Sequence, residues 1–191
     1  MIKYAECMAD GDQIKNHLIL CSNSFIPPLN TYVNINEYSK KIKEHAYTFE
    51  AWEKDILVGL IACYYNDYKK NAFITNVSVA NEYQGKNIAK QLLNKATKKA
   101  ILQNFKCITL EVNQENEKAI GFYKTMGYKL YSNNESNYLM KKTIKKDRNI
   151  LVSICCLTYN HEKYIRDAIE GFINQQTTFN IEILIHDDAS T

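Results

Sequence analysis

The sequence predicts an α/β protein in which helices flank a central sheet, followed by an incomplete β-α-β unit. Three observations predict this class. Strand-like apolar segments occupy much of residues 46–79. From residue 86, apolar residues recur every three to four positions, which is the helical period. A basic, aperiodic segment at 141–149 then precedes a second, continuously apolar strand.

The composition is that of an ordinary soluble globular protein. The 191 residues are 46% hydrophobic and 24% charged, with a net charge of +3. This charge is too small to indicate nucleic-acid binding, and apolar runs such as 150–157 are too short to span a bilayer. The first residues turn acidic at once and lack the basic-then-apolar pattern of a signal peptide.

Six cysteines are scattered along the chain without a C-x-x-C pair. This spacing predicts neither a zinc site nor a disulfide framework, and no metal is expected. Most of the cysteines lie in apolar runs, so we expect them to be buried small hydrophobic residues. Together these features indicate a reducing, cytoplasmic setting.

The first 79 residues are predicted to hold two helices and three strands. The only two prolines, in "FIPPLNTY", mark a loop between the helices. The strands are rich in β-branched and aromatic residues, and a turn at 53–55 separates the first two. The predicted helices are 10–22 and 34–45, and the predicted strands are 46–53, 56–65 and 71–79.

The next segment is predicted to continue as helix, strand, helix and hairpin. The apolar period from residue 86 predicts a helix of about five turns. A strand at 107–112 follows, and then a shorter helix that ends near Gly127. Residues 128–132 and 137–142 are predicted to form the terminal hairpin. One face of the shorter helix carries Ala119, Ile120, Tyr123 and Met126.

The basic segment is interpreted as a linker at 143–149, which separates domains at 1–142 and 150–191. The strand "ILVSICCL" is of the kind that is buried on both faces of a parallel sheet. A helix with apolar residues from Tyr164 to Ile173 follows, and then the strand "IEILIH". This order predicts one right-handed β-α-β unit.

A candidate anion site lies between the strand that ends at Val79 and the long helix. The first N–H groups of a helix have no internal acceptor, and the helix dipole places partial positive charge there. In the turn "ANEYQGK", Gly85 allows close approach of a ligand and Lys86 adds a charge. By itself this pattern also fits a plain surface turn before a core helix.

Two motifs in this region resemble those of the GNAT acyltransferases, the acetyl-coenzyme A-dependent superfamily. In "LEVNQENEKAIGFYKTMGY", Asn116, Ala119 and Tyr123 have the spacing of the second signature of that family. The earlier stretch resembles the pyrophosphate loop of the family, with one glycine replaced by asparagine. Its residues are Gln84, Gly85, Lys86, Asn87, Ile88 and Ala89.

The resemblance, which extends over about 1–142, implies a GNAT fold with a mixed sheet and acetyl-CoA as co-substrate. It implies that the backbone of Val77, Ser78 and Val79 pairs with the pantetheine arm and that residues 84–89 bind the pyrophosphate. It implies a polar cofactor contact from Asn116 and a proton donor to the departing thiolate at Tyr123. A phenol titrates near ~10, so it is protonated at neutral pH. Asn tolerates unusual backbone angles, so the loop is expected to form despite Asn87.

The general base is left open by the sequence. The family often has a carboxylate on the strand before the loop, where this chain reads Thr75-Asn76. Glu111, Glu50 and His45 are substitutes, and proton removal through ordered water is an equal alternative.

Residues 150–191 resemble the start of a family-2 glycosyltransferase of the GT-A type. The matching residues are Thr158-Tyr159-Asn160, Gln175 and Asp187-Asp188-Ala189-Ser190. In that family the aspartates contact the nucleotide of the sugar donor, but the later metal-binding and catalytic residues have no counterpart here. We therefore expect no glycosyltransferase activity, and a unit covered by the first domain or by a second copy in a homodimer.

The predicted function is transfer of an acetyl group from acetyl-CoA to a primary amine. The glycosyltransferase-like segment suggests an amino sugar in surface-polysaccharide synthesis as the acceptor. A protein N-terminus, a lysine side chain and a polyamine remain open. The acceptor pocket is expected at 23–45, where Glu37 and Glu44 are the only acids. The alternative is a non-catalytic acetyl-CoA-binding or docking module of a longer polypeptide.

Overall fold

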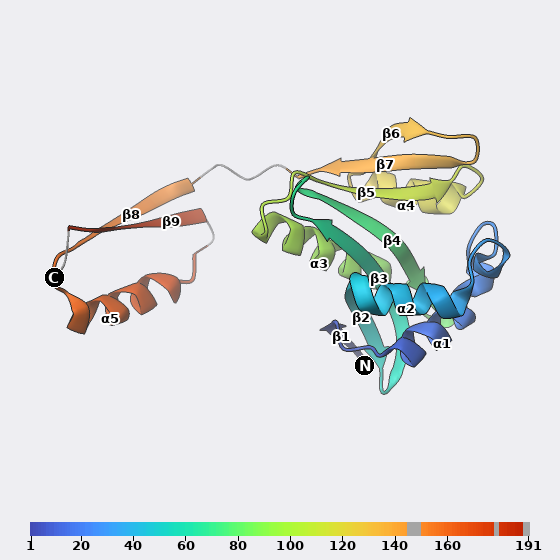
Figure 1. Cartoon of the computed structure of the whole chain (residues 1–191), viewed down its shortest axis with the longest axis horizontal. Coiled ribbons are helices and arrows are strands. Elements are labelled where there is room, and N and C mark those ends of the chain that lie inside the picture. Colours follow the sequence, from blue (N-terminus) through green and yellow to red (C-terminus); the bar gives the residue numbers. More distant parts are fainter. Residues whose placement is uncertain (145–149, 178–179, 189–191) are drawn as a thin grey trace. The chain divides into compact units, whose positions relative to one another are not determined.

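A computed structural model of the chain describes residues 1–144, 150–177 and 180–188. The chain divides into two compact units, residues 1–145 and 146–191 (Figure 1). Residues 145–149 of the expected linker lie outside the described residues. So do Ala189 and Ser190 of the expected aspartate motif.

The described part of the first unit alternates helices and strands in the predicted order. The strand at the N-terminus was not predicted, because only two of its five residues are even half-buried and the alternation is weak. The long helix begins two residues later than its period suggested. The elements are β1 (Ile2–Glu6), α1 (Gly11–Cys21), α2 (Ile35–His45), β2 (Tyr47–Glu53), β3 (Ile56–Asn66), β4 (Asn71–Val79), α3 (Ile88–Leu102), β5 (Cys107–Asn113), α4 (Glu117–Thr125), β6 (Lys129–Asn133) and β7 (Asn137–Thr143).

These strands form one mixed sheet in the order β1-β2-β3-β4-β5-β7-β6. Neighbouring strands are antiparallel except for β4 and β5, which run parallel and are joined by α3. A parallel pair needs such a crossover, and the helix supplies it. The prediction of a mixed central sheet flanked by helices is confirmed.

Each face of the sheet is covered by its own apolar cluster. One cluster joins α3 to strands β2–β5 and to α4 and β7, with Leu92 and Leu93 of α3 fully buried. The other joins α1 and α2 to the opposite face, with Ile14, Leu18 and Ile42 fully buried. Both faces of the sheet centre are therefore covered by apolar side chains. The open space lies where strands β4 and β5 separate.

Strand β4 contains a bulge at Thr75. Its pairing with β3 shifts there, since Ala62 faces Asn76 whereas Cys63 faces Ile74. An extra residue bends a strand and re-aims the side chains beyond it. Ile74 packs into the α3 cluster, whereas Asn76 and Ser78 contact the α1 side.

Strands β4 and β5 pair only at their beginnings. Residues 71–74 pair with 107–110, and no pairing with β5 is present for 75–79 within the described sheet. The two strands diverge toward their carboxyl ends (Figure 1). This separation leaves one edge of β4 open.

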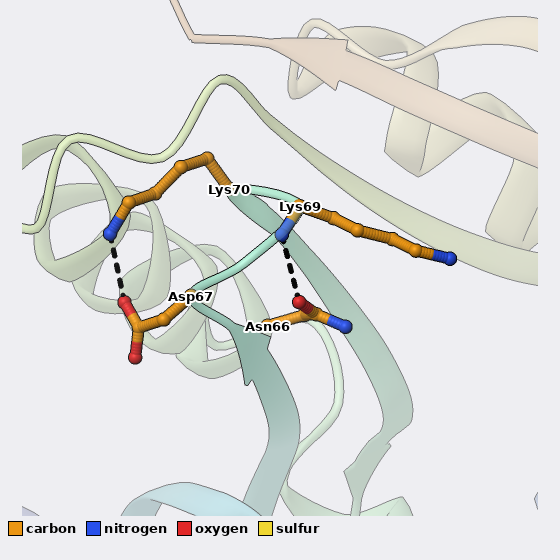
Figure 2. A network of polar contacts seen from close by, with 4 residues as sticks. All are labelled: Asn66, Asp67, Lys69 and Lys70. Carbon is orange, nitrogen blue, oxygen red and sulfur yellow. Dashed lines mark hydrogen bonds and ion pairs between the residues drawn. The ribbon is translucent and has the colours of Figure 1, made fainter.

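Polar contacts within the β3–β4 turn close the other end of β4 (Figure 2). Lys70 Nζ donates to Asp67 Oδ1 at 2.9 Å, and the backbone N–H of Lys69 donates to Asn66 Oδ1 at 2.9 Å. The Lys106 N–H also donates to the carbonyl of Lys70 at 2.8 Å. The turn thus holds β4 beside the start of β5.

The second unit is a β-α-β unit, as predicted. Its elements are β8 (Ile150–Thr158), α5 (Glu162–Ile173) and β9 (Asn180–Asp187), and the two strands are parallel. The expectation of a strand buried on both faces does not hold here. Leu157 is 75% exposed, and Leu184 of β9 is 52% exposed. A two-stranded sheet with one helix leaves apolar faces uncovered.

The cysteines are divided between core and surface. Cys21, Cys63 and Cys107 are buried, as expected, whereas Cys7 and Cys155 are exposed. Cys156 is half-buried, so three of the six are buried and the prediction that most are buried is wrong. All six thiols, each within the described residues, are free.

Candidate active site

A cleft of about 1110 Å³ occupies the space where β4 and β5 diverge. Its walls are the carboxyl halves of both strands, helix α4, residues 83–85 and 87–90, and parts of 24–38. Small-molecule sites usually enclose ~300–1,000 Å³. The cleft is therefore large enough for a long donor together with a second, smaller molecule.

The open edge of β4 presents backbone groups to this cleft. The Ala80 N–H donates to the carbonyl of Val58 at 2.9 Å. Because hydrogen-bonded pairs alternate along an antiparallel ladder, Ser78 also directs its backbone toward β3. Val77 and Val79 direct theirs to the opposite side. Of the three predicted backbone contacts, Val77 is thus available to a ligand, and so is the N–H of Val79, whose carbonyl accepts from Gln84 Nε2 at 3.3 Å. Ser78 instead faces β3 with its backbone, and its side chain bonds to His17 and Asn76.

The turn before α3 has the geometry of an anion cradle. Gly85 and Asn87 both adopt left-handed backbone angles, with φ of 76° and 61°. The first backbone bond of the helix runs from the Gln91 N–H to the Asn87 carbonyl at 3.0 Å. The N–H groups of residues 88–90 precede that bond and form the helix N-terminus, where anions bind. Asn87 thus performs the backbone role that glycine has in the family pattern.

Cationic side chains surround this turn. Lys118 Nζ on α4 donates to Gln84 Oε1 at 3.1 Å, which links the two sides of the cleft. Lys90 and Lys118 line the cleft, although the sequence motif did not single them out. The motif did single out Lys86. Its Nζ lies 4.9 Å from the centre of the Tyr83 ring, and the residue is absent from the cleft lining. Two lysines beside a helix N-terminus favour a polyanion.

Helix α4 carries the other two predicted residues to the cleft. Asn116 caps the helix, since its Oδ1 accepts from the Ala119 N–H at 3.0 Å. Its Nδ2 makes no hydrogen bond within the described structure and remains a donor. Tyr123 lines the cleft and is 8% exposed. Burial raises the pKa of its phenol, so Tyr123 stays protonated well above neutral pH.

The structure separates the three substitutes for a general base. Glu50 is fully buried and accepts from the Met8 and Ala9 N–H groups and the Thr48 hydroxyl, which makes it structural. His45 lies beside Glu44 at the surface, away from the cleft. Glu111 is exposed and is the one carboxylate among the residues that line the cleft.

A buried polar chain that sequence reasoning missed borders the cleft on the α1 side. His17 Nδ1 lies 2.8 Å from the Leu57 carbonyl, and its Nε2 lies 2.9 Å from Ser78 Oγ. Ser78 Oγ lies 2.8 Å from the amide of Asn76. Burial lowers the pKa of His17 to about 4, so the ring is neutral. A signal existed, since His17 occupies the apolar stripe of its helix between Ile14 and Cys21.

Segment 24–38 forms the far wall of the cleft, where the acceptor was expected. Phe25, Ile26 and Tyr32 line it, while Glu37 and Glu44 do not. Tyr38 reaches across from α2, and its hydroxyl donates to the Thr75 carbonyl at 2.7 Å. This wall is aromatic and apolar rather than charged.

Two further features concern metals and membranes. Among the residues that the structure describes, no group of histidine, cysteine and acidic side chains is arranged to hold a metal ion. Over the same ranges, no helix has the length and apolar character that crossing a bilayer requires.

A sheet split between two parallel strands, with an anion cradle beside the split, is the architecture of the coenzyme A-dependent N-acetyltransferases. The model of the acetyltransferase (GNAT) family matches residues 12–128. The chain belongs to this family. Families of this kind transfer acyl groups to amines of small molecules or proteins.

Solved structures agree with this fold. The ribosomal-protein-S18-alanine N-acetyltransferase of Escherichia coli is 16% identical with a TM-score of 0.63, and the match covers 78% of this chain and 99% of that one. The PaiA N-acetyltransferase of Thermoplasma acidophilum, in complex with coenzyme A, is 17% identical with a TM-score of 0.61, over 75% and 99%. At these identities the likeness establishes the fold alone.

The C-terminal segment has separate relatives. The model of glycosyl transferase family 2 matches residues 153–191. Uncharacterized proteins of Mycobacterium tuberculosis and Mycobacterium bovis are 52% identical over 40 residues, which is 21% of this chain and 12% of each relative. The match thus spans about an eighth of the length of those relatives.

Proposed function

We propose that the chain transfers the acetyl group of acetyl-CoA to a primary amine. The observation that carries this proposal is the cleft between β4 and β5, which has open backbone groups on one wall and a helix N-terminus at one end. A pantetheine arm carries amides that pair with an open strand edge, and its pyrophosphate needs converging N–H donors. Both requirements are met within one cavity.

Each proposed residue has a distinct task. The backbone of Val77 and Val79 pairs with the pantetheine amides. The N–H groups of residues 85–90 bind the pyrophosphate, with Lys90 and Lys118 nearby, whereas the Gln84 N–H already donates to the Asn81 carbonyl at 3.2 Å. The free Nδ2 of Asn116 donates to the cofactor.

The reaction is direct attack of the amine on the thioester carbonyl. The new C–N bond forms as the C–S bond breaks, one proton leaves the amine, and one reaches the departing sulfur. Tyr123 supplies the proton to sulfur, because its buried phenol is protonated at working pH. Glu111 or ordered water receives the amine proton.

An amino sugar is our first candidate for the acceptor. Its support is the similarity of residues 153–191 to glycosyl transferase family 2, which is an analogy between neighbouring segments. A polyamine fits less well, because Glu111 is the one carboxylate in the cleft lining. We also propose that residues 1–142 form the acetyltransferase domain and that residues 150–191 belong to a separate glycosyltransferase-like domain.

The test combines binding with turnover. Acetyl-CoA should raise the melting temperature of the chain, since a ligand of the folded state stabilises it by mass action. Free thiol should then appear when acetyl-CoA is mixed with glucosamine, a nucleotide-linked amino sugar, a lysine peptide or spermidine. No rise in melting temperature would rule out the proposal.

The second candidate is a module that binds acetyl-CoA without transferring the acetyl group. The observation that favours it is the lack of an acid at Thr75-Asn76, which leaves the cleft with one exposed carboxylate. A raised melting temperature without thiol release from any amine would support this candidate. Saturable release that depends on Tyr123 would exclude it.

A further inference from the structure

The polar chain His17–Ser78–Asn76 has only one arrangement of protons that satisfies it. The Leu57 carbonyl can only accept, so His17 Nδ1, 2.8 Å away, must carry a proton. The ring is buried at 2% exposure with no acid beside it, so it is neutral and Nε2 is unprotonated. Ser78 Oγ, 2.9 Å from Nε2, must therefore donate to it.

This arrangement decides which way the Asn76 amide is turned. Ser78 has a single hydroxyl proton, and His17 uses it. The structure places Asn76 Oδ1 2.8 Å from Ser78 Oγ, but because the serine proton goes to His17, the amide must be turned so that its NH₂ group donates at this position. The oxygen and nitrogen of an asparagine amide are nearly identical in size and position, so which is which is assigned from the hydrogen bonds that they make. The Cys21 thiol, 3.6 Å from Nε2, is too weak a donor to replace the Ser78 hydroxyl.

The other polar atom of the Asn76 amide is then the oxygen, and it lacks a partner. This position is buried and makes no hydrogen bond within the described residues. The Tyr38 hydroxyl interacts with the Asn76 side chain, but it gives its proton to the Thr75 carbonyl at 2.7 Å and so does not donate to this oxygen. A buried acceptor without a donor is costly and calls for one from a ligand. Asn76 belongs to the wall of the cleft, at the bulge where β4 opens.

We propose that Asn76, held by Ser78 and His17, accepts a hydrogen bond from the attacking amine and so orients its lone pair toward the thioester. This inference rests on the proposed acetyl transfer. A neutral primary amine has two N–H donors besides its lone pair, so it can give one to Asn76 and still attack. His17 and Ser78 are positioning residues, since they act through Asn76.

The proton arrangement can be tested without any substrate. Long-range ¹H–¹⁵N NMR of the labelled full chain at pH 7 reports which His17 nitrogen carries the proton. The proposal requires protonated Nδ1 and unprotonated Nε2. A proton on Nε2, in either a neutral or a charged ring, would let Ser78 donate to Asn76 and would overturn the proposal.

The role in the reaction is tested with acetyl-CoA and glucosamine. Ser78→Ala and Asn76→Ala should each raise the KM for glucosamine about five- to tenfold, as loss of one hydrogen bond does. The KM for acetyl-CoA should stay unchanged. His17→Leu should behave like Ser78→Ala, and His17→Gln should recover most of the loss, because the glutamine oxygen can accept from Ser78.

Controls separate the possible failures. Melting temperatures recorded for every variant exclude simple unfolding. Equal KM values for glucosamine in the wild type and in both alanine variants would overturn the proposal while leaving acetyl transfer intact. Absence of transfer by the wild type to any amine would instead remove the proposed function, and the His17 proton would still decide the arrangement of the polar chain.

Discussion

A β-carbon at Gly59 would lie 2.8 Å from Cγ2 of Ile88. Gly59 is on β3, and Ile88 is the first residue of α3, directly after the turn that forms the anion cradle. Ala51 and Leu92 lie at 3.3 Å from the same position, so the site is closed on several sides. The missing side chain lets the start of α3 approach the sheet.

Gly59→Ala should therefore destabilise the fold by about 1–3 kcal/mol, as overpacking of a core does. It should also weaken acetyl-CoA binding, because the displaced helix carries the cradle. The measurements are urea unfolding and calorimetric titration with acetyl-CoA. Gly121→Ala is the matched control, since nothing lies within 4 Å of its β-carbon position. This helical change should stabilise by about 0.5–1 kcal/mol.

Asn87→Gly should keep or tighten acetyl-CoA binding, because glycine adopts the observed φ of 61° without strain. Asn87→Ala should weaken binding about fivefold, since alanine pays about 1 kcal/mol in this region. Asn104→Ala is the control, as Asn104 has a φ of 56° in a turn outside the cleft lining. It should lower stability without changing the acetyl-CoA dissociation constant. A clear loss of binding in Asn87→Gly would contradict the cradle.

Asn116 has a structural and a proposed ligand-binding role that one substitution can separate. Asn116→Ser retains a side-chain cap for α4 but removes the amide donor, so stability should hold while acetyl-CoA binds several-fold more weakly. Asn116→Ala should lose both the helix cap and the amide donor, and the lost cap should lower the free energy of unfolding by about 1 kcal/mol. Thermal unfolding and acetyl-CoA titration measure the two effects. Equal acetyl-CoA binding by the wild type and the serine variant would confine Asn116 to capping.

Tyr123→Phe should lower kcat about 10²-fold with little change in acetyl-CoA binding, since only the proton donor is lost. Because burial raises the pKa of the phenol, Tyr123 should produce no fall in rate below its ordinary pKa of about 10. Thiol release from pH 6 to 9.5 checks both statements. Tyr131→Phe on exposed β6 should behave as the wild type. Unchanged kcat in Tyr123→Phe would require another proton donor.

His17 should make the fold less stable in mild acid. Its pKa is about 4 in the folded chain and 6.5 when exposed, so below pH 6.5 the unfolded state binds a proton that the folded state does not. Stability is therefore lost as pH falls from about 6.5 to 4, by a total of about 3 kcal/mol. Urea unfolding at several pH values measures it. The difference between wild type and His17→Gln isolates this residue, and parallel curves would contradict the burial of a neutral ring.

The sequence by itself determined the order of helices and strands after β1, the two family motifs and the separate C-terminal β-α-β unit. These features have local causes, since hydrophobic period, turn residues and caps act over a few positions. The tolerance of Asn87 for unusual backbone angles belongs with them, whereas its left-handed φ of 61° is a finding of the structure.

Only the tertiary structure decided how the cleft is built. The bulge at Thr75 depends on how β4 pairs with β3, and the opening depends on where β4 and β5 stop pairing. His17 and Ser78 are 61 positions apart, and no local pattern connects them. The tertiary structure also excludes Glu50 as the general base, because Glu50 is buried and accepts hydrogen bonds from backbone N–H groups. Contacts of this kind arise from packing between distant segments, so only the folded chain assigns each polar side chain its partner.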